Sequence, residues 1–264
     1  MKLSLFQGLR CPFCDGTLLA SKLNPTDDDP QYGLLTCHCG RYPLVAGIPI
    51  FKKGVVGSGG ETVEDIAAMI ESGNCTEAPV AVLLPPLPPS PSLAPAWIQN
   101  LPALKGIWRL KHFVHQRQAR GWHVQAAAIL LEAVHRRTAC DLFDFYFRRS
   151  AVKTEHYNYF AYRFGQPRHL VALSLASIIR EPSHPILDLA CGFGHITRSL
   201  AAQAGLQPVI GLDTLFFSLY IAKHWMAPQA TYICGDADMS LPFTDKLFSA
   251  VFCSDALPYF VNKA

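Results

Sequence analysis

Three aspartates in the C-terminal third of the chain each lie at the end of a short apolar segment. They are Asp188, Asp213 and Asp236. Because the carboxyl ends of parallel strands meet at one edge of a sheet, we expect these carboxylates to converge on a common crevice. A ribose presents two adjacent hydroxyl groups, and one carboxylate can accept hydrogen bonds from both. The acids therefore predict a site for a nucleoside-containing cofactor, with helix capping as the alternative for any single acid.

The segments around these acids predict alternating strands and helices. Three apolar segments are predicted as strands: 185–189, 208–213 and 230–235. Two stretches between them are predicted as helices: 196–204 and 215–224. Each connection is long enough for a right-handed crossover between parallel strands. Gly192 and Gly194 lie in the turn after the first strand, where they let backbone N–H groups approach a ligand. The pattern predicts an α/β fold with a Rossmann-like open parallel sheet, although the full Gly-x-Gly-x-x-Gly fingerprint of dinucleotide sites is absent.

Residues 155–260 resemble the class I S-adenosylmethionine-dependent methyltransferases of the type 11 group. In that family the turn after the first strand wraps the amino acid and ribose of the cofactor. The acid that ends the second strand, here Asp213, binds the ribose hydroxyls, and the pair after the third strand, here Asp236 and Ala237, lies beside adenine. The resemblance implies these S-adenosylmethionine-binding residues: Asp188, Ala190, Cys191, Gly192, Gly194, Asp213, Asp236, Ala237 and Ser254. Ala190 stands where many members of the family have a glycine.

The resemblance implies transfer of a methyl group to an acceptor atom by direct displacement. Because a sulfonium is already a strong electrophile, orientation and desolvation are the main contributions of the protein, and a general base is optional. Asp255, Tyr259 and His195 are candidates for such a base, each with a structural role as the alternative, and no catalytic residue is assigned. We expect a small-molecule or lipid-like acceptor. RNA methyl transfer and a non-catalytic scaffold are the alternatives.

A fourth predicted strand, 247–254, lies close to the end of the sequence. The sheet of the family usually has seven strands, so we expect this sequence to be a piece of a longer protein. A sheet that stops after the fourth strand leaves an unpaired strand edge. The sequence therefore predicts self-association through that edge.

Four cysteines near the N-terminus form two pairs at metal-ligand spacing. Cys11 and Cys14 make a Cys-x-x-Cys knuckle, and Cys37 and Cys39 make a tighter Cys-x-Cys pair. A β-hairpin can bring four thiolates around one tetrahedral Zn²⁺, which is structural because four protein ligands leave no open position for water. His38 is an alternative ligand. A redox pair and disulfides are other interpretations, but the flanks predict short strands and no signal peptide is recognised.

Residues 8–53 resemble a small zinc-ribbon module that precedes the catalytic domain in some bacterial methyltransferases. The same module occurs as a separate methyltransferase-activating protein. The run 42–51 contributes to this resemblance. A zinc ribbon ahead of this catalytic fold also occurs in enzymes that modify a guanine of ribosomal RNA, which keeps the RNA alternative open.

We divide the chain into a zinc-ribbon-like domain, a proline-rich linker, a helical region with a lid, and a partial methyltransferase domain. Their bounds are 1–53, 54–100, 101–180 and 181–264. Within the linker, Glu61–Ser72 predicts a short helix, and the proline-rich run Ala78–Pro95 predicts an extended spacer because prolines lack the N–H that helices and ladders need. Residues 101–149 are rich in Lys and Arg, which indicates either an RNA-binding surface or a solvated helix face. Tyr157 and Tyr162 are lid candidates.

Composition adds few constraints. The 264 residues are 50% hydrophobic, which is ample for a buried core, and the net charge is only +3. Prolines interrupt the apolar stretches, so no membrane span is predicted. The remaining five of the nine cysteines are scattered and are expected to be reduced, which favours a cytoplasmic protein.

Overall fold

The computed structural model describes residues 8–21, 29–56, 60–83, 102–136, 155–179, 182–205 and 207–261. These residues form one eight-stranded sheet in the order β1-β2-β3-β4-β7-β6-β5-β8. Its first four strands are β1 (Leu19–Ser21), β2 (Gly33–Cys37), β3 (Gly40–Val45) and β4 (Ile48–Phe51). The other four are β5 (Ile186–Leu189), β6 (Val209–Asp213), β7 (Thr231–Gly235) and β8 (Ala250–Cys253).

The sheet has an antiparallel part and a parallel part that meet at β4. Strands β1 to β4 form an antiparallel meander, whereas β4, β7, β6, β5 and β8 are all mutually parallel neighbours. This confirms the Rossmann-like parallel sheet and the small β region before it. The two parts are joined by the pairing of β4 with β7, which no sequence pattern predicted: Ile50 lies opposite Cys234 and Phe51 opposite Gly235.

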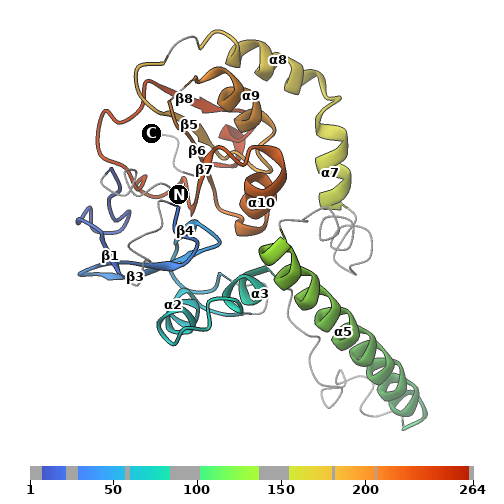
Figure 1. Ribbon diagram of the computed structural model, residues 1–264. Helices are drawn as coiled ribbons and strands as arrows, with labels where there is room; N and C mark the ends of the chain where they lie inside the picture. The colour runs from blue at the N-terminus through green and yellow to red at the C-terminus, as the bar shows by residue number, and fades with distance from the viewer. Residues whose placement is uncertain are drawn as a thin grey trace.

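Helices cover one face of the sheet (Figure 1). They are α2 (Val63–Glu71), α3 (Ala78–Leu83), α8 (Pro167–Ala176), α9 (His195–Gln203) and α10 (Phe216–Ile221). Buried side chains from all five helices pack with alternate strand residues in one large apolar cluster. Among the described residues, the other face is covered by non-helical segments that include Leu9, Phe243 and Phe248.

The N-terminal part of the linker contains two helices, α2 and α3, where the sequence predicted only one. Helix α2 begins where expected, because Thr62 and Asp65 form a reciprocal capping box. Residues 78–83 form α3 rather than the predicted extended spacer, so that part of the prediction is wrong. Pro79 is the second residue of α3, where its missing N–H breaks no helical hydrogen bond. Residues 84–101 lie outside the described part of the chain.

Helix α5 (Pro102–Arg136) runs away from the sheet, with its C-terminal half nearer to α3 (Figure 1). Its described surface carries exposed Arg109, Lys111, Arg117 and Arg120 together with exposed apolar side chains such as Leu110 and Phe113. Among the described residues, no helix combines the length and apolar character that crossing a membrane requires. Helix α7 (Glu155–Arg163) precedes α8 and packs against the turn after β5, where Tyr159 and Phe160 contact Phe193.

Candidate functional site

A cavity of about 570 Å³ opens at the carboxyl ends of β5, β6, β7 and β8. The turns after these four strands supply most of its lining, as expected for an open parallel sheet. Six of the nine predicted cofactor residues line it: Ala190, Gly192, Asp213, Asp236, Ala237 and Ser254. The cavity volume is in the usual range for small-molecule and cofactor sites.

The carboxylate of Asp213 is held in a fixed orientation at the end of β6. One oxygen accepts a hydrogen bond from the backbone N–H of Gly192 at 2.9 Å, and the other accepts from the N–H of Leu215 at 2.9 Å. Burial raises the pKa of Asp213, while these backbone donors and Lys52 lower it. Because a carboxylate offers about four lone-pair positions, two bonds leave capacity for two further donors.

Asp188 and Cys191 do not line the main cavity. They line a small adjoining hollow of about 30 Å³, which shares Ala190, Gly192 and Ser254 with it. Asp188 is 2% exposed and accepts a hydrogen bond from the Thr197 hydroxyl at 2.5 Å. Burial raises the pKa of Asp188 to about 7. The three predicted aspartates therefore lie around one connected region, but Asp188 is the buried member.

Gly194 lines neither hollow. It is the N-cap of α9 with φ of 78°, and a Cβ at this position would lie 2.9 Å from the Cβ of Ala222. Gly194 therefore permits the turn and the close packing of α9 on its neighbours. Ala190 also has positive φ, at 57°, a conformation that costs an alanine about 1 kcal/mol. That strain is the physical consequence of the missing glycine noted in the sequence.

Arg163 is a site residue that sequence reasoning missed. It ends α7, is 6% exposed, and donates to a carboxylate oxygen of Asp255 at 2.6 Å. Its second terminal nitrogen lies 3.5 Å from the hydroxyl of Ser254. The guanidinium thus lines the small hollow and ties α7 to Ser254 and Asp255, which line the main cavity after β8. In the sequence, its signal is a lone arginine at the end of an aromatic segment.

The three candidate bases have different surroundings. The Asp255 carboxylate is engaged by Arg163 and lies 3.6 Å from Arg168. Nε2 of His195 lies 3.1 Å from the carbonyl oxygen of Phe160, and burial lowers the pKa of His195 to about 4. Tyr259 lines the cavity and is 82% exposed. The first two thus have structural partners, which matches the alternative roles that the sequence left open.

Of the two aromatic lid candidates, only Tyr162 has a described side chain. Tyr162 is half exposed and does not line the cavity, and the side chain of Tyr157 lies outside the described residues. Tyr159 lines the cavity instead, and the Phe160 ring packs edge-on against Phe193 at 5.6 Å. Tyr159 and Tyr162 are three residues apart on the same side of α7, and their rings pack edge-on with centroids 5.7 Å apart, so Tyr162 lies next to a cavity-lining residue without lining the cavity itself.

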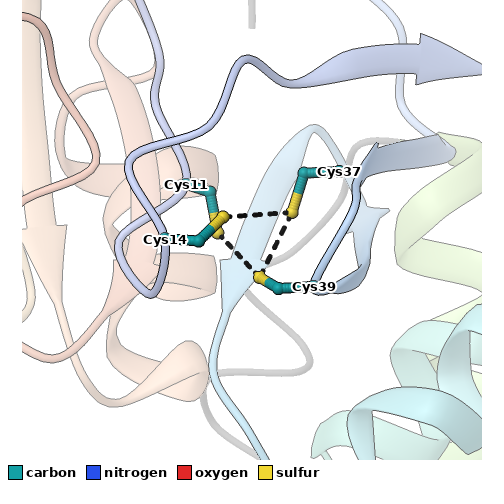
Figure 2. A group of neighbouring side chains, drawn as sticks. All are labelled: Cys11, Cys14, Cys37 and Cys39. Atoms are coloured by element: carbon teal, nitrogen blue, oxygen red, sulfur yellow. Dashed lines mark hydrogen bonds between the residues drawn. The ribbon is translucent and has the colours of Figure 1, made fainter.

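The four predicted metal ligands gather into one cluster, with their sulfur atoms pointing toward one another (Figure 2). All four sulfurs lie within 4.8 Å of one another, and three pairs are 3.3, 3.4 and 3.8 Å apart. Four thiolates at the usual zinc–sulfur distance in a tetrahedron are about 3.8 Å apart. The donor set and spacing therefore fit zinc, and the exposed His38 is outside the quartet.

The buried Tyr42 side chain contacts the cysteine cluster. Its hydroxyl lies 3.2 Å from the sulfur of Cys11 and 3.3 Å from that of Cys39, and its side chain is buried. This hydrogen bond lowers the pKa of the Cys39 thiol to about 6. Hydrogen bonds to metal-ligating groups orient them and stabilise the charged form. The Tyr42 ring also packs edge-on against Phe51 at the end of β4.

The C-terminal part of the chain is similar to known methyltransferases. Residues 186–264 match a family model described as a methyltransferase domain. An uncharacterized methyltransferase of Synechocystis sp. is 42% identical over 85 residues, which are 32% of this chain and 38% of that protein. A 2-phytyl-1,4-naphtoquinone methyltransferase of Thermosynechococcus vestitus is 40% identical over 70 residues, which are 25% of this chain and 30% of that protein.

Among solved structures, the YcgJ protein of Bacillus subtilis is similar, with 26% identity and a TM-score of 0.32. That similarity covers 36% of this chain and 42% of the other. The chain spans about a third of the length of the curated relatives that it matches, 38% and 30% respectively. Residues 186–264 therefore resemble a methyltransferase domain, and the reaction of the whole protein is a matter for proposal.

Proposed function

We propose that this chain is an S-adenosylmethionine-dependent methyltransferase that acts on a small-molecule or lipid-like acceptor. The observation that carries the proposal is the Asp213 carboxylate, fixed by two backbone N–H groups in a cavity at the carboxyl ends of parallel strands. The match of residues 186–264 to a methyltransferase domain supports it.

We assign the cofactor contacts from this geometry and from the family resemblance. Asp213 accepts hydrogen bonds from the ribose hydroxyls, and Asp236 with Ala237 lies beside adenine. The turn from Asp188 to Gly194, with Ala190, Cys191 and Gly192, surrounds the rest of the cofactor, and Ser254 closes the opposite side. A Cβ at Gly192 would meet no atom within 4 Å, so the backbone there is open to a ligand.

S-adenosylmethionine supplies an electrophilic methyl group on a sulfonium. The chain contributes orientation and exclusion of water through side chains that line the cavity, among them Tyr159, Phe193 and Leu215. Arg163 holds Asp255 beside Ser254 and so fixes the turn after β8. No side chain is assigned as a base, because Asp255 and His195 are already engaged.

The acceptor is proposed from two observations. One relative is named as a methyltransferase of a phytylated naphtoquinone, which is a small lipid-like molecule. The cavity also has apolar side chains near its opening, such as Leu215 and Tyr259, which are 53% and 82% exposed. An apolar acceptor would cover part of this exposed surface.

RNA is the second candidate acceptor, because the described part of α5 carries exposed Arg and Lys side chains. Binding of RNA through this surface predicts an affinity that falls about a thousandfold between ~50 and ~200 mM salt. The double variant Arg117→Gln/Arg120→Gln should bind RNA more weakly than wild type at the same salt concentration. An RNA affinity that is weak and independent of salt would rule out this candidate.

Zinc at Cys11, Cys14, Cys37 and Cys39 is proposed to be structural, in a zinc-ribbon-like domain within residues 1–53. The remaining proposed parts are a linker at 54–100, a helical region with a lid at 101–180, and the methyltransferase domain at 181–264. Self-association through the edge of β8 and a cytoplasmic location complete the proposal. Metal analysis of the purified protein tests the zinc assignment, with one zinc per chain as the expected result.

Calorimetric binding of S-adenosylhomocysteine tests the proposed function. The protein as purified should bind this product, and Asp213→Asn should weaken binding at least about tenfold, since the amide loses the charge that strengthens hydrogen bonds from ribose. Asp245→Asn, an exposed turn residue outside the cavity, is the matched control. An absence of binding heat with the wild-type protein would favour the non-catalytic scaffold.

A further inference from the structure

The last strand of the cysteine module ends at the same edge of the sheet as the cofactor cavity. Strand β4 pairs with β7 in parallel, so Phe51 lies opposite Gly235, which lines the cavity. The residue that directly follows β4 is Lys52. The parallel pairing of β4 with β7 therefore places the Lys52 side chain, a cation of the N-terminal module, at the carboxyl edge where the predicted cofactor residues lie.

Lys52 makes a specific contact at this edge. Its Nζ donates a hydrogen bond to the backbone carbonyl oxygen of Thr214 at 3.1 Å, across a sequence separation of 162 residues. Thr214 lines the cavity and directly follows Asp213. The side chain of Lys52 is partly buried, so solvent screens its charge less than that of a surface lysine.

From these contacts we propose that Lys52 is a positioning residue for the cofactor site. It fixes the Thr214 carbonyl and thereby the backbone that holds the Asp213 carboxylate. The cysteine module thus contacts the backbone beside the cofactor site through β4 and Lys52, although the residues that line the cavity all belong to the C-terminal part of the chain. This inference rests on the proposed function, because it assigns a role in binding the cofactor of that reaction.

The cysteine cluster determines where Lys52 lies. Phe51, which precedes it, is 2% exposed, and its ring packs edge-on against Tyr42 with centroids 5.3 Å apart. The Tyr42 hydroxyl in turn contacts the sulfurs of Cys11 and Cys39. A continuous line of buried contacts therefore runs from the metal ligands to the end of β4. Such packed side chains transmit small displacements because protein interiors are close-packed.

Electrostatics gives the proposal a second readout. Burial raises the pKa of Asp213 and the Lys52 cation lowers it. The other titratable groups that interact with Asp213 are Asp188, Cys191, Tyr159 and Cys234, from β5, the following turn, α7 and β7. With these unchanged, loss of Lys52 raises the pKa of Asp213. The affinity for a ribose-containing ligand should then begin to fall at a higher pH as the solution is acidified.

The experiment measures S-adenosylhomocysteine affinity by calorimetry across pH for three variants of the full chain. Lys52→Met should weaken binding about tenfold at neutral pH and move the acid limb of the profile upward. Lys52→Arg, which keeps the charge and a donor, should stay within about threefold of wild type. Lys53→Met is the matched control, since Lys53 is exposed and its Nζ lies over the ring of Phe13.

Each outcome decides one question. If wild type binds and Lys52→Met binds equally well with an unchanged pH profile, the role of Lys52 is wrong while the proposed function stands. Equal losses in Lys52→Met and Lys53→Met would also overturn it, because a non-specific charge effect explains them. If Lys52→Met does not fold, Lys52→Gln replaces it with the same expected loss. Failure of wild type to bind contradicts the proposed function itself.

Discussion

The two sides of the parallel strands β7, β6, β5 and β8 differ in whether another strand covers them. At β7 the edge is closed by β4, and Cys234 on β7 is fully buried. At β8, among the described residues, no strand pairs with the outer edge, and Val251 is 58% exposed. The covered edge borders the predicted adenine and ribose positions, whereas the open edge borders Ser254 and Asp255. The β7 side of the cavity is therefore covered by β4, whereas the outer edge of β8 is unpaired among the described residues and is available to another strand.

The largest expected effect concerns the module that closes the β7 edge. Cys11→Ser should abolish stoichiometric zinc and lower the free energy of unfolding by about 5 kcal/mol, because metal binding to a structural site contributes directly to folding. Denaturant unfolding and metal analysis measure both quantities. Cys75→Ser, a partly buried cysteine outside the cluster, should change stability by about 1 kcal/mol. Equal losses in both variants would show that the cluster binds no metal.

A pH-dependent effect of up to about 4 kcal/mol is expected at Asp188, on the strand next to the open edge. Burial raises the pKa of Asp188 from 3.8 to about 7, so the folded state binds more protons than the unfolded state between these values. The free energy of unfolding should therefore fall as pH rises from about 4 to about 7. Asp188→Asn should remove this component, which appears as the difference between two unfolding curves.

Asp236→Asn is the control for that measurement, because Asp236 is an exposed aspartate that directly follows β7. The two variants compare the same substitution at a buried and at an exposed aspartate. A wild-type minus Asp188→Asn curve that does not change with pH would contradict the raised pKa of the buried Asp188.

The open edge predicts a smaller, concentration-dependent effect. Val251→Lys should weaken self-association about tenfold in sedimentation experiments, because a charge on an unpaired strand disfavours edge-to-edge pairing. Val55→Lys is a close control, since Val55 is 59% exposed and lies outside the named strands. A protein that stays monomeric at all concentrations, or a response of both variants alike, would argue against pairing through β8.

The smallest expected effect tests strain at the cofactor turn. Ala190→Gly should raise the free energy of unfolding by about 1 kcal/mol, because Ala190 has φ of 57° and glycine adopts this conformation without penalty. Ala202→Gly, at an exposed position of α9, should lower it by about 1 kcal/mol. A loss of stability in both variants would show that the turn is not strained.

Much of the site could be predicted because its signals are local. The acids at strand ends, the glycines of the turn and the paired cysteines are each visible within a few residues of sequence. Predictions that needed side-chain direction were weaker: Tyr162 was expected in the lid, but Tyr159 lines the cavity. The extended spacer was wrong at residues 78–83, because Pro79 lies in the first turn of α3, where a helix tolerates proline, and α3 packs on the core.

The sequence by itself determined the α/β class, the strand-end aspartates and the four clustered cysteines, since each depends on periodicity or spacing between near neighbours. Only the tertiary structure decided that β4 joins β7, that Arg163 pairs with Asp255 across 92 residues, and that Lys52 reaches Thr214. The physical reason is that such contacts are selected by the packing of a shared core over long separations. No local pattern of residue types specifies which distant strand or charge will be the partner.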